Sequence, residues 1–172
     1  MAKTRTNPIV VIETSMGTIK AKLWADKSPV TVENFISYVD KQFYDALIFH
    51  RVIDGFMIQG GGLNSNMQPK RTAAPIKNEA SSEVTNDRGT LAMARTEDIH
   101  SATAQFFINL VDNDFLNHRS NNPSEFGYCV FGKVIEGLDV VDAIGKVKTT
   151  TVAGHDDVPI DTVEIKSIRL AE

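Results

Sequence analysis

The sequence predicts a mainly β domain, either an antiparallel barrel or a sandwich, within a chain of 172 residues. Two observations favour this fold class. Many short segments are β-branched or alternate polar with apolar residues, and clusters of Gly, Asn, Asp and Pro separate them. Only two segments have the apolar spacing of a helix, which argues against alternating βαβ units. No repeat or linker divides the chain, so residues 1–172 are expected to form one domain.

The first predicted element is a β-hairpin. Residues 9–14 (IVVIET) form a β-branched, nearly continuous apolar run, and residues 18–23 alternate polar with apolar side chains. Ser15, Met16 and Gly17 provide the turn between them. The two segments are therefore expected to pair as adjacent antiparallel strands.

Two helices are predicted. Ser28 followed by Pro29 indicates an N-cap and the first helical position, and a second, shorter helix is expected over residues 138–144. Gly145 is expected to end that second helix in the left-handed conformation. The first helix has one apolar stripe, formed by Val32, Phe35, Ile36 and Val39.

Short strand candidates fill the rest of the chain, and residues 117–127 (NHRSNNPSEFG) are expected to form one long surface loop. A last strand is expected after Pro159, through Val163, Ile165 and Ile168. The other candidates are residues 48–53, 56–59, 90–94, 105–110 and 128–134.

Composition limits the function classes. The net charge is −4 with both signs interspersed, so no basic tract points to nucleic acid or an anionic membrane, and no apolar run could span a bilayer. The lone Cys129 lies in an apolar run and is expected to be a buried core thiol. Residues 1–8 lack the apolar core of a secretory signal, which favours the cytoplasm, or the periplasm if a leader has been removed. No assembly segment is apparent, which favours a monomer.

The first candidate for chemistry is Arg51. It stands inside the apolar, strand-like run of residues 49–62, and arginine is rarely buried without a partner. A structural salt bridge is one interpretation, and a side chain lying along the surface with its head in water is another. A functional role beside an apolar surface is the third.

The second candidate is the predicted strand over residues 105–110. One face of it carries large apolar residues typical of a core. The opposite face places an aromatic ring between two amides, Gln105, Phe107 and Asn109. Such a face suits the floor of a cleft that binds something partly apolar and partly amide-like, although a packed ring flanked by solvated amides is equally compatible with the pattern.

Other types of site receive less support. The four histidines show no metal-ligand spacing with one another or with Cys129, and His50 is expected to be a hydrogen-bonded core histidine. The sequence has no G-x-S-x-G nucleophile elbow. The glycines at 60–62 lack the Lys-Ser or Lys-Thr of a phosphate loop, so backbone crowding near a ligand or a bulge explains them better.

Three long runs carry a family resemblance. FHRVIDGFMIQGGG, GTLAMARTEDIHSATAQFFINL and FGYCVFGKVIEGLDVVD strongly resemble the cyclophilin family of peptidyl-prolyl cis-trans isomerases, particularly its bacterial branch. The resemblance extends over nearly the whole chain. It implies an eight-stranded antiparallel closed β-barrel capped by two α-helices, and an isomerase that needs no metal or cofactor and acts on proline-containing polypeptides.

The resemblance also implies roles for individual residues. Arg51 falls on the catalytic arginine of the family, and Gln59 would support it from behind. Gln105 would line the groove, and the backbone of Ala94 and Arg95 would hold residues around the substrate proline. The full set of substrate-binding residues is Phe56, Met57, Ala94, Arg95, Gln105, Phe107, Phe115, Leu116 and Tyr128.

Three of these positions depart from the eukaryotic pattern. Phe115 replaces a tryptophan, Tyr128 a histidine, and Arg95 an asparagine that acts mostly through its main chain. Because the indole N–H donor is lost, the immunosuppressant cyclosporin is expected to bind with reduced affinity. A non-catalytic module or chaperone that binds proline segments on the same barrel is the alternative function, since fold alone does not guarantee activity.

Overall fold

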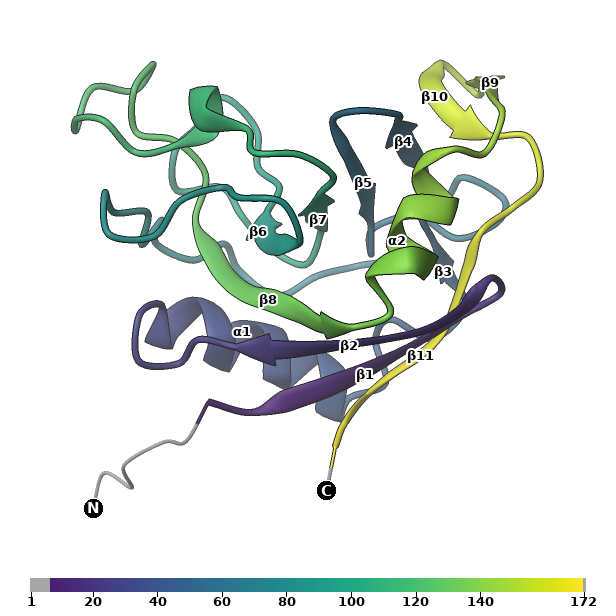
Figure 1. Cartoon of the computed structure of the whole chain (residues 1–172), viewed down its shortest axis with the longest axis horizontal. Helices are drawn as coiled ribbons and strands as arrows, with labels where there is room; N and C mark the ends of the chain where they lie inside the picture. Colours follow the sequence, from purple (N-terminus) through teal and green to yellow (C-terminus); the bar gives the residue numbers. More distant parts are fainter. Residues whose placement is uncertain (1–6, 172) are drawn as a thin grey trace.

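The computed structural model describes residues 7–171, and its main feature is one strongly curled antiparallel sheet (Figure 1). The sheet has nine strands: β1 (Ile9–Thr14), β2 (Gly17–Leu23), β3 (Leu47–Ile48), β4 (Arg51–Ile53), β5 (Met57–Gly60), β6 (Thr90–Met93), β7 (Phe106–Asn109), β8 (Val130–Glu136) and β11 (Glu164–Leu170). Their order across the sheet is β3-β11-β1-β2-β8-β6-β7-β5-β4. The predicted hairpin is confirmed, because β1 pairs with β2 and aligns Ile12 with Ile19.

The two edge strands of this sheet, β3 and β4, are consecutive in the chain and are separated only by Phe49 and His50. On one side, the backbone N–H of Phe49 donates to the carbonyl of Val163, 3.0 Å away, just before β11. On the other, the N–H of Ile48 donates to the carbonyl of Leu63, also at 3.0 Å, just beyond β5. The sheet therefore curls until its edges meet. If β3 and β4 are counted as one bent strand, the nine strands become the eight of the implied barrel.

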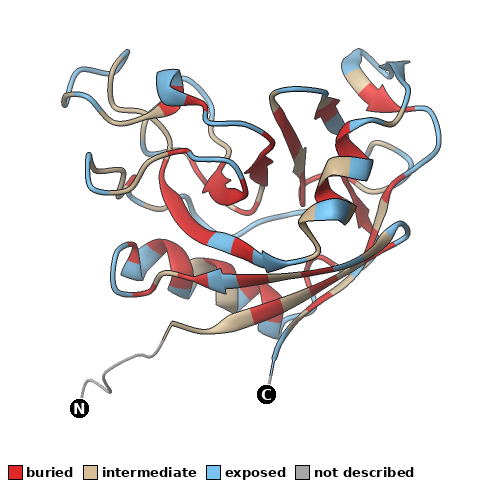
Figure 2. Ribbon diagram, in the orientation of Figure 1, coloured by how far each residue is buried: buried red, intermediate tan, exposed pale blue. Residues whose placement is uncertain are grey.

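The first helix, α1 (Pro29–Asp40), lies against the curled sheet, and several of its residues are buried (Figures 1 and 2). It contributes to an aromatic core. The ring centroid of Phe35 lies 5.5 Å from that of Phe106 and 5.1 Å from that of Phe131, and all three side chains are fully buried. Ser28 is the N-cap residue and Pro29 begins the helix, as predicted, but the Ser28 side chain makes no capping hydrogen bond. The Ser28 hydroxyl instead donates to the carbonyl of Val130 at 2.8 Å, where it satisfies a buried backbone acceptor.

The second helix, α2 (Leu138–Gly145), is also present, but the predicted role of Gly145 is wrong. Gly145 belongs to the helix and is not among the residues with positive φ. A Cβ atom there would lie 2.7 Å from Cδ1 of Leu110, so the glycine permits close packing rather than a turn. The left-handed glycine lies at the other end, where Gly137 precedes the helix with φ of 85°.

Three short elements were not predicted. A 3-10 turn, η1 (Asp114–Leu116), follows β7, and β9 (Thr149–Val152) pairs with β10 (His155–Pro159) in a separate two-stranded ribbon. All four residues of β9 are exposed, so the segment lacks the alternation by which a half-buried strand is recognised. The ribbon lies beside β4. No helix among residues 7–171 is long and apolar enough to cross a membrane.

A buried polar network lies at the end of β7. Asn109, predicted to lie on a cleft floor, is fully buried instead, and its Nδ2 donates to Oδ1 of Asn86 (3.1 Å) and Oγ1 of Thr90 (2.9 Å). Its Oδ1 accepts a hydrogen bond from Nδ2 of Asn113 at 2.8 Å, and this nitrogen also donates to the carbonyl of Phe56. Asn109 therefore joins β6, β7 and the start of β5.

We predict that Asn109→Ala lowers the free energy of unfolding by about 2–4 kcal/mol, because buried groups on Asn86 and Asn113 lose their partner. Urea unfolding monitored by circular dichroism measures the loss. Asn121→Ala, at an exposed position in the surface loop, provides the control and should stay within about 0.5 kcal/mol of wild type. Equal stability of the two variants would contradict the structural role of the network.

Candidate active site

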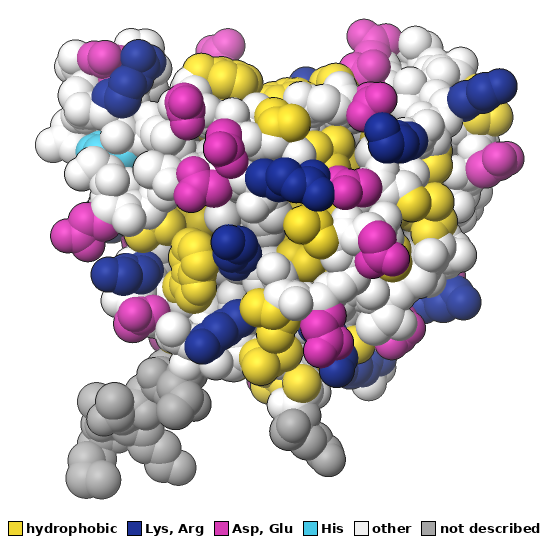
Figure 3. Space-filling model, in the orientation of Figure 1, with side chains coloured by type: hydrophobic (Ala, Val, Ile, Leu, Met, Phe, Trp, Pro, Cys, Tyr) yellow, Lys and Arg dark blue, Asp and Glu magenta, His cyan; other side chains and the backbone are white. Residues whose placement is uncertain are grey.

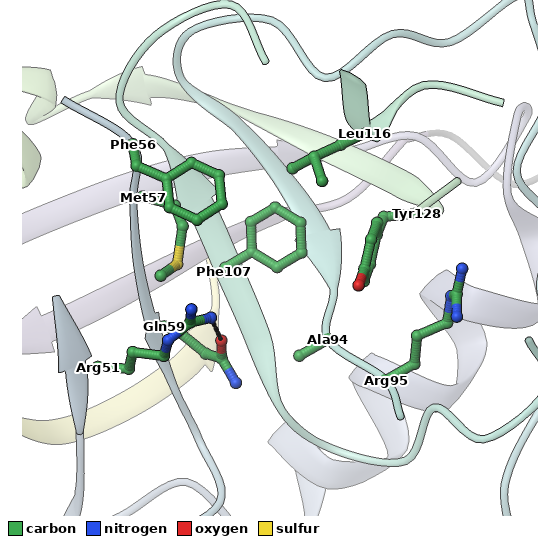
Figure 4. A pocket seen from close by; sticks show the side chains of 9 residues that line it. All are labelled: Arg51, Phe56, Met57, Gln59, Ala94, Arg95, Phe107, Leu116 and Tyr128. Carbon is green, nitrogen blue, oxygen red and sulfur yellow. Dashed lines mark hydrogen bonds between the residues drawn. The ribbon is translucent and has the colours of Figure 1, made fainter. Parts of the chain in front are cut away.

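A pocket opens on the face of the barrel formed by β4, β5 and the ends of β6 and β7 (Figure 4). It collects residues from five separate parts of the chain. Of the eleven residues assigned to the site by the resemblance, nine line this pocket: Arg51, Phe56, Met57, Gln59, Ala94, Arg95, Phe107, Leu116 and Tyr128.

The floor of the pocket is apolar. Phe107, Met57 and Leu116 are buried, and with Ala92 and Val130 they form a cluster distinct from the main core. The Phe107 ring faces the middle of the pocket in Figure 4. A hollow lined by an aromatic ring, a thioether and a leucine suits a small apolar ring.

The pairing of three strands places the polar residues beside this floor. In β4 and β5, Arg51 lies opposite Gln59, and in β5 and β7, Gln59 lies opposite Phe107. Residues that face each other across an antiparallel ladder project to the same side of the sheet. One row across the sheet therefore carries a cation, an amide and an aromatic ring.

Arg51 is exposed at the pocket edge, and its charge is not neutralised by a carboxylate among the described residues. The interpretation as a structural salt bridge is therefore wrong. The guanidinium instead donates from Nη1 to Oε1 of Gln59 over a long 3.4 Å (Figure 4). Nε2 of Gln59 in turn donates to Oε1 of Gln105 at 3.0 Å. Gln105 does not line the pocket. It orients Gln59, which in turn orients Arg51.

Gly60, the last residue of β5, and Gly62 both lie in crowded surroundings, and Gly62 leaves room for the Gln105 side chain. A Cβ atom on Gly62 would overlap the side chain of Gln105, and one on Gly60 would lie 2.6 Å from the carbonyl oxygen of Ile48. Crowding is therefore found at both positions, but its source is the Gln105 side chain and the Ile48 backbone rather than the expected ligand or bulge. The sequence does not reveal the contact between Gly62 and Gln105, because these residues meet only in the folded barrel.

Arg95 and Tyr128 form the wall opposite Arg51 (Figure 4). Cζ of Arg95 lies 4.5 Å from the centroid of the Tyr128 ring, and Nε and Nη2 donate to the carbonyl of Gly127 at 3.3 and 3.1 Å. The Tyr128 ring meets Phe107 edge-on at 5.6 Å. The expected contribution of Arg95 was mainly its backbone, but the side chain itself holds this wall in place.

Phe115, predicted to complete the rim, does not line the pocket. Its side chain is 65% exposed, and its ring stacks on Phe56 at a centroid distance of 5.6 Å. Within the turn of η1, Leu116 points inward and Phe115 outward. Phe115 therefore supports Phe56 from outside the pocket.

His50, next to Arg51, is only 6% exposed, but its Nδ1 has no hydrogen-bond partner among the described residues. The expectation of a buried histidine is confirmed, whereas hydrogen bonding of that nitrogen is not found. Burial lowers the pKa of His50 from 6.5 to about 4, with further contributions from the charges of His155 and Arg51. The His155 ring, on β10, meets it edge-on at a centroid distance of 6.2 Å.

Cys129 is buried, as expected, beside the hydroxyl groups of Ser28 and Thr31. Its thiol lies 3.4 Å from Oγ1 of Thr31 and 3.5 Å from Oγ of Ser28. Burial raises the pKa of the thiol, so the protonated, poorly nucleophilic form is favoured. Cys129 is a structural residue of the core.

Comparison with known proteins agrees with this geometry. The model of the family "Cyclophilin type peptidyl-prolyl cis-trans isomerase/CLD" matches residues 9–170. The peptidyl-prolyl cis-trans isomerase cyp18 of Streptomyces antibioticus is 56% identical over 161 residues, covering 94% of this chain and 97% of that protein. Peptidyl-prolyl cis-trans isomerase B of Escherichia coli K12 is 53% identical over 164 residues, covering 95% and 100%.

A solved structure is also similar over almost the full length. The crystal structure of a Cryptosporidium parvum cyclophilin type peptidyl-prolyl cis-trans isomerase superposes with a TM-score of 0.80 at 27% identity, covering 97% of this chain and 99% of that one. A second crystal structure of that protein, in the presence of the dipeptide Ala-Pro, gives a TM-score of 0.79.

The low pKa of His50 predicts a pH-dependent stability. Above pH 6.5 the ring is neutral in both the folded and the unfolded chain, whereas between pH 6.5 and about 4 only the unfolded chain takes up the proton. Wild type should therefore lose roughly 2–4 kcal/mol over this range through His50 alone. In His50→Phe, the free energy of unfolding measured with urea should depend correspondingly less on pH. If the free energy of unfolding changed equally with pH in both proteins, the low pKa of His50 would be contradicted.

Proposed function

The chain belongs to the cyclophilin-type peptidyl-prolyl cis-trans isomerases and catalyses rotation about the peptide bond before proline, and we propose that Arg51 and the Phe107 pocket carry out this reaction. The observation that supports these roles is a guanidinium without a carboxylate partner among the described residues, oriented by Gln59 beside a buried apolar floor. The alternative, a binding module without catalysis, has less support because the arginine and the pocket are both intact.

The reaction faces a barrier of electronic origin. The nitrogen lone pair of a peptide bond is delocalised into the carbonyl, which gives a rotation barrier of about 18–20 kcal/mol. Before proline the two isomers differ by only about 0.5–1 kcal/mol, so both are populated but exchange over tens of seconds or longer. A catalyst therefore has to stabilise the twisted amide, and it has no bond to break.

Arg51 is proposed to supply that stabilisation. In the twisted amide the lone pair is no longer delocalised, so the proline nitrogen becomes pyramidal and basic. A guanidinium N–H directed at this nitrogen forms a stronger hydrogen bond in the transition state than in the planar ground state, which is the condition for catalysis. Gln59 reduces the conformational freedom of the guanidinium and leaves its other N–H groups available.

The apolar floor is proposed to have two further effects. Phe107, Met57 and Leu116 hold the proline ring, so that the preceding carbonyl rotates about a fixed centre. The same side chains exclude water, which would otherwise stabilise the more polar planar amide. Each tenfold gain in rate corresponds to about 1.4 kcal/mol, so one directed hydrogen bond together with positioning accounts for several orders of magnitude.

The family binds proline-containing peptides, and one solved relative was crystallised in the presence of Ala-Pro. For this chain we propose a broad range of proline-containing polypeptides, because the pocket receives only the proline and its neighbours. We also propose reduced affinity for cyclosporin, since Phe115 offers no N–H donor at its exposed position.

We predict that Arg51→Ala lowers kcat/KM for an Xaa-Pro peptide about 100-fold or more, as expected for the loss of a donor to the transition state. Arg51→Lys should recover little of the activity, because an ammonium lacks the planar fork that Gln59 orients. A protease-coupled assay of cis-to-trans conversion measures both variants. Arg71→Ala, an exposed arginine that does not line the pocket, provides the control. Wild-type turnover in Arg51→Ala would rule out the proposed mechanism.

Gly62→Ala should lower kcat about 3- to 10-fold with little change in KM, because the added methyl displaces Gln105 and releases Gln59. A double-mutant cycle separates this effect from a general loss of stability. If Gly62 acts through Gln105, then Gly62→Ala adds nothing in a Gln105→Ala background. Additive losses in the two variants would show that the glycine has a purely structural role.

Phe115→Trp should raise cyclosporin affinity by up to about tenfold, because the indole N–H restores one hydrogen-bond donor. Inhibition of the isomerase reaction measures the change, and Phe115→Met, whose side chain has no N–H or O–H donor, provides the control. An unchanged inhibition constant would indicate that residues other than Phe115 limit the affinity.

A further inference from the structure

We propose that Arg95 gives this isomerase a preference for prolines flanked by an acidic side chain. The inference rests on the proposed function of the pocket and concerns its substrate class. Two features of Arg95 carry it: the guanidinium is fixed in position at the pocket wall, and its positive charge is not neutralised by any carboxylate of residues 7–171.

The position of the guanidinium is set by four contacts. It lies over the Tyr128 ring, Nε and Nη2 donate to the carbonyl of Gly127, and Nη1 donates to the carbonyl of Thr96 at 2.9 Å. These bonds use three of the five N–H groups of an arginine and leave two. Because the side chain is already ordered, binding a ligand there costs little further conformational entropy.

Within residues 7–171, the charge of Arg95 is not paired with a carboxylate, in contrast to the charges of two other arginines in the protein. Arg88 and Arg169 each form a two-pronged pair with a carboxylate, Asp142 and Asp45 respectively. The acceptors of Arg95 are neutral carbonyl oxygens, so its full charge remains available at the rim. The nine residues lining the pocket include two arginines and no Asp or Glu, although the whole chain has a net charge of −4. Elsewhere acidic and basic side chains are interspersed, as on the face shown in Figure 3.

Acidic residues do occur near Arg95 in the sequence. Glu97 and Asp98 are exposed, and Oδ1 of Asp98 accepts a hydrogen bond from the backbone N–H of His100 within the same loop. Neither forms an ion pair with Arg95. The local carboxylates therefore leave the guanidinium open to a carboxylate from the substrate.

The two arginines lie on opposite sides of the aromatic floor in Figure 4. A bound proline on Phe107, with its nitrogen facing Arg51, extends its neighbouring residues across Tyr128 towards Arg95. Glu or Asp close to the proline reaches the guanidinium there, whereas Lys or Arg meets like charge. Because the pair is partly exposed to water, the preference is modest, about three- to fivefold at low salt, and weakens as salt is added.

The test uses short peptides that differ only by Glu or Gln at the second or third residue before or after the proline. For each peptide, kcat/KM and the dissociation constant from NMR titration are measured at low and high salt. We expect Glu to be preferred about three- to fivefold over Gln in at least one of these positions at low salt, and the ratio to approach one at high salt.

Variants assign the preference to one residue. The Glu/Gln ratio should fall to about one in Arg95→Gln and be partly retained in Arg95→Lys, which keeps the charge but loses the fork. Lys166→Gln removes one positive charge from β11, which carries no pocket residue, and should leave the ratio unchanged.

Equal use of Glu and Gln peptides by wild type, or a preference that persists in Arg95→Gln, would overturn the proposal. Failure of the proposed function looks different. In that case Arg51→Ala isomerises neutral peptides as fast as wild type, while the NMR titration still reports whether Glu peptides bind more tightly than Gln peptides through Arg95.

Discussion

The register of β4, β5 and β7 is the constraint on which the site depends. It places Arg51, Gln59 and Phe107 in one row on the same side of the sheet, although the first and last are far apart in the chain. A shift of one residue in either ladder would turn the guanidinium or the ring to the opposite face. The bend at Phe49 and His50, where the edges of the sheet meet, holds β4 in that register.

Around this row, the two pocket arginines are held in position by neutral groups, which leave their positive charges uncompensated within the described part of the chain. Amides rather than carboxylates position Arg51, and carbonyl oxygens position Arg95. A carboxylate partner would hold either guanidinium more strongly, but it would also compensate the charge that the substrate is meant to meet. The same reasoning accounts for the buried asparagines behind β7, which fix the backbone of Phe56 without adding charge near the pocket.

Sequence patterns predicted most elements, because hydrophobic periodicity is a local property. The hairpin, both helices and every strand of the main sheet except the split of residues 48–53 followed from spacing alone. The errors concern side chains whose partners are distant in the chain. Gly145 packs against Leu110 and Asn109 joins a buried network, and neither contact has a local signature.

The sequence by itself determined the strand and helix content, the family, and which residues are candidates for the site, since long ordered runs identify these directly. Only the tertiary structure decided where each of these residues lies relative to the pocket. Gln105 orients Gln59 and does not line the pocket, Phe115 supports Phe56 from outside, and the Arg95 guanidinium is held at the pocket wall. The physical reason is that a side chain's direction and charge compensation depend on strand register and on neighbours brought together by folding, and the order of residues does not specify them.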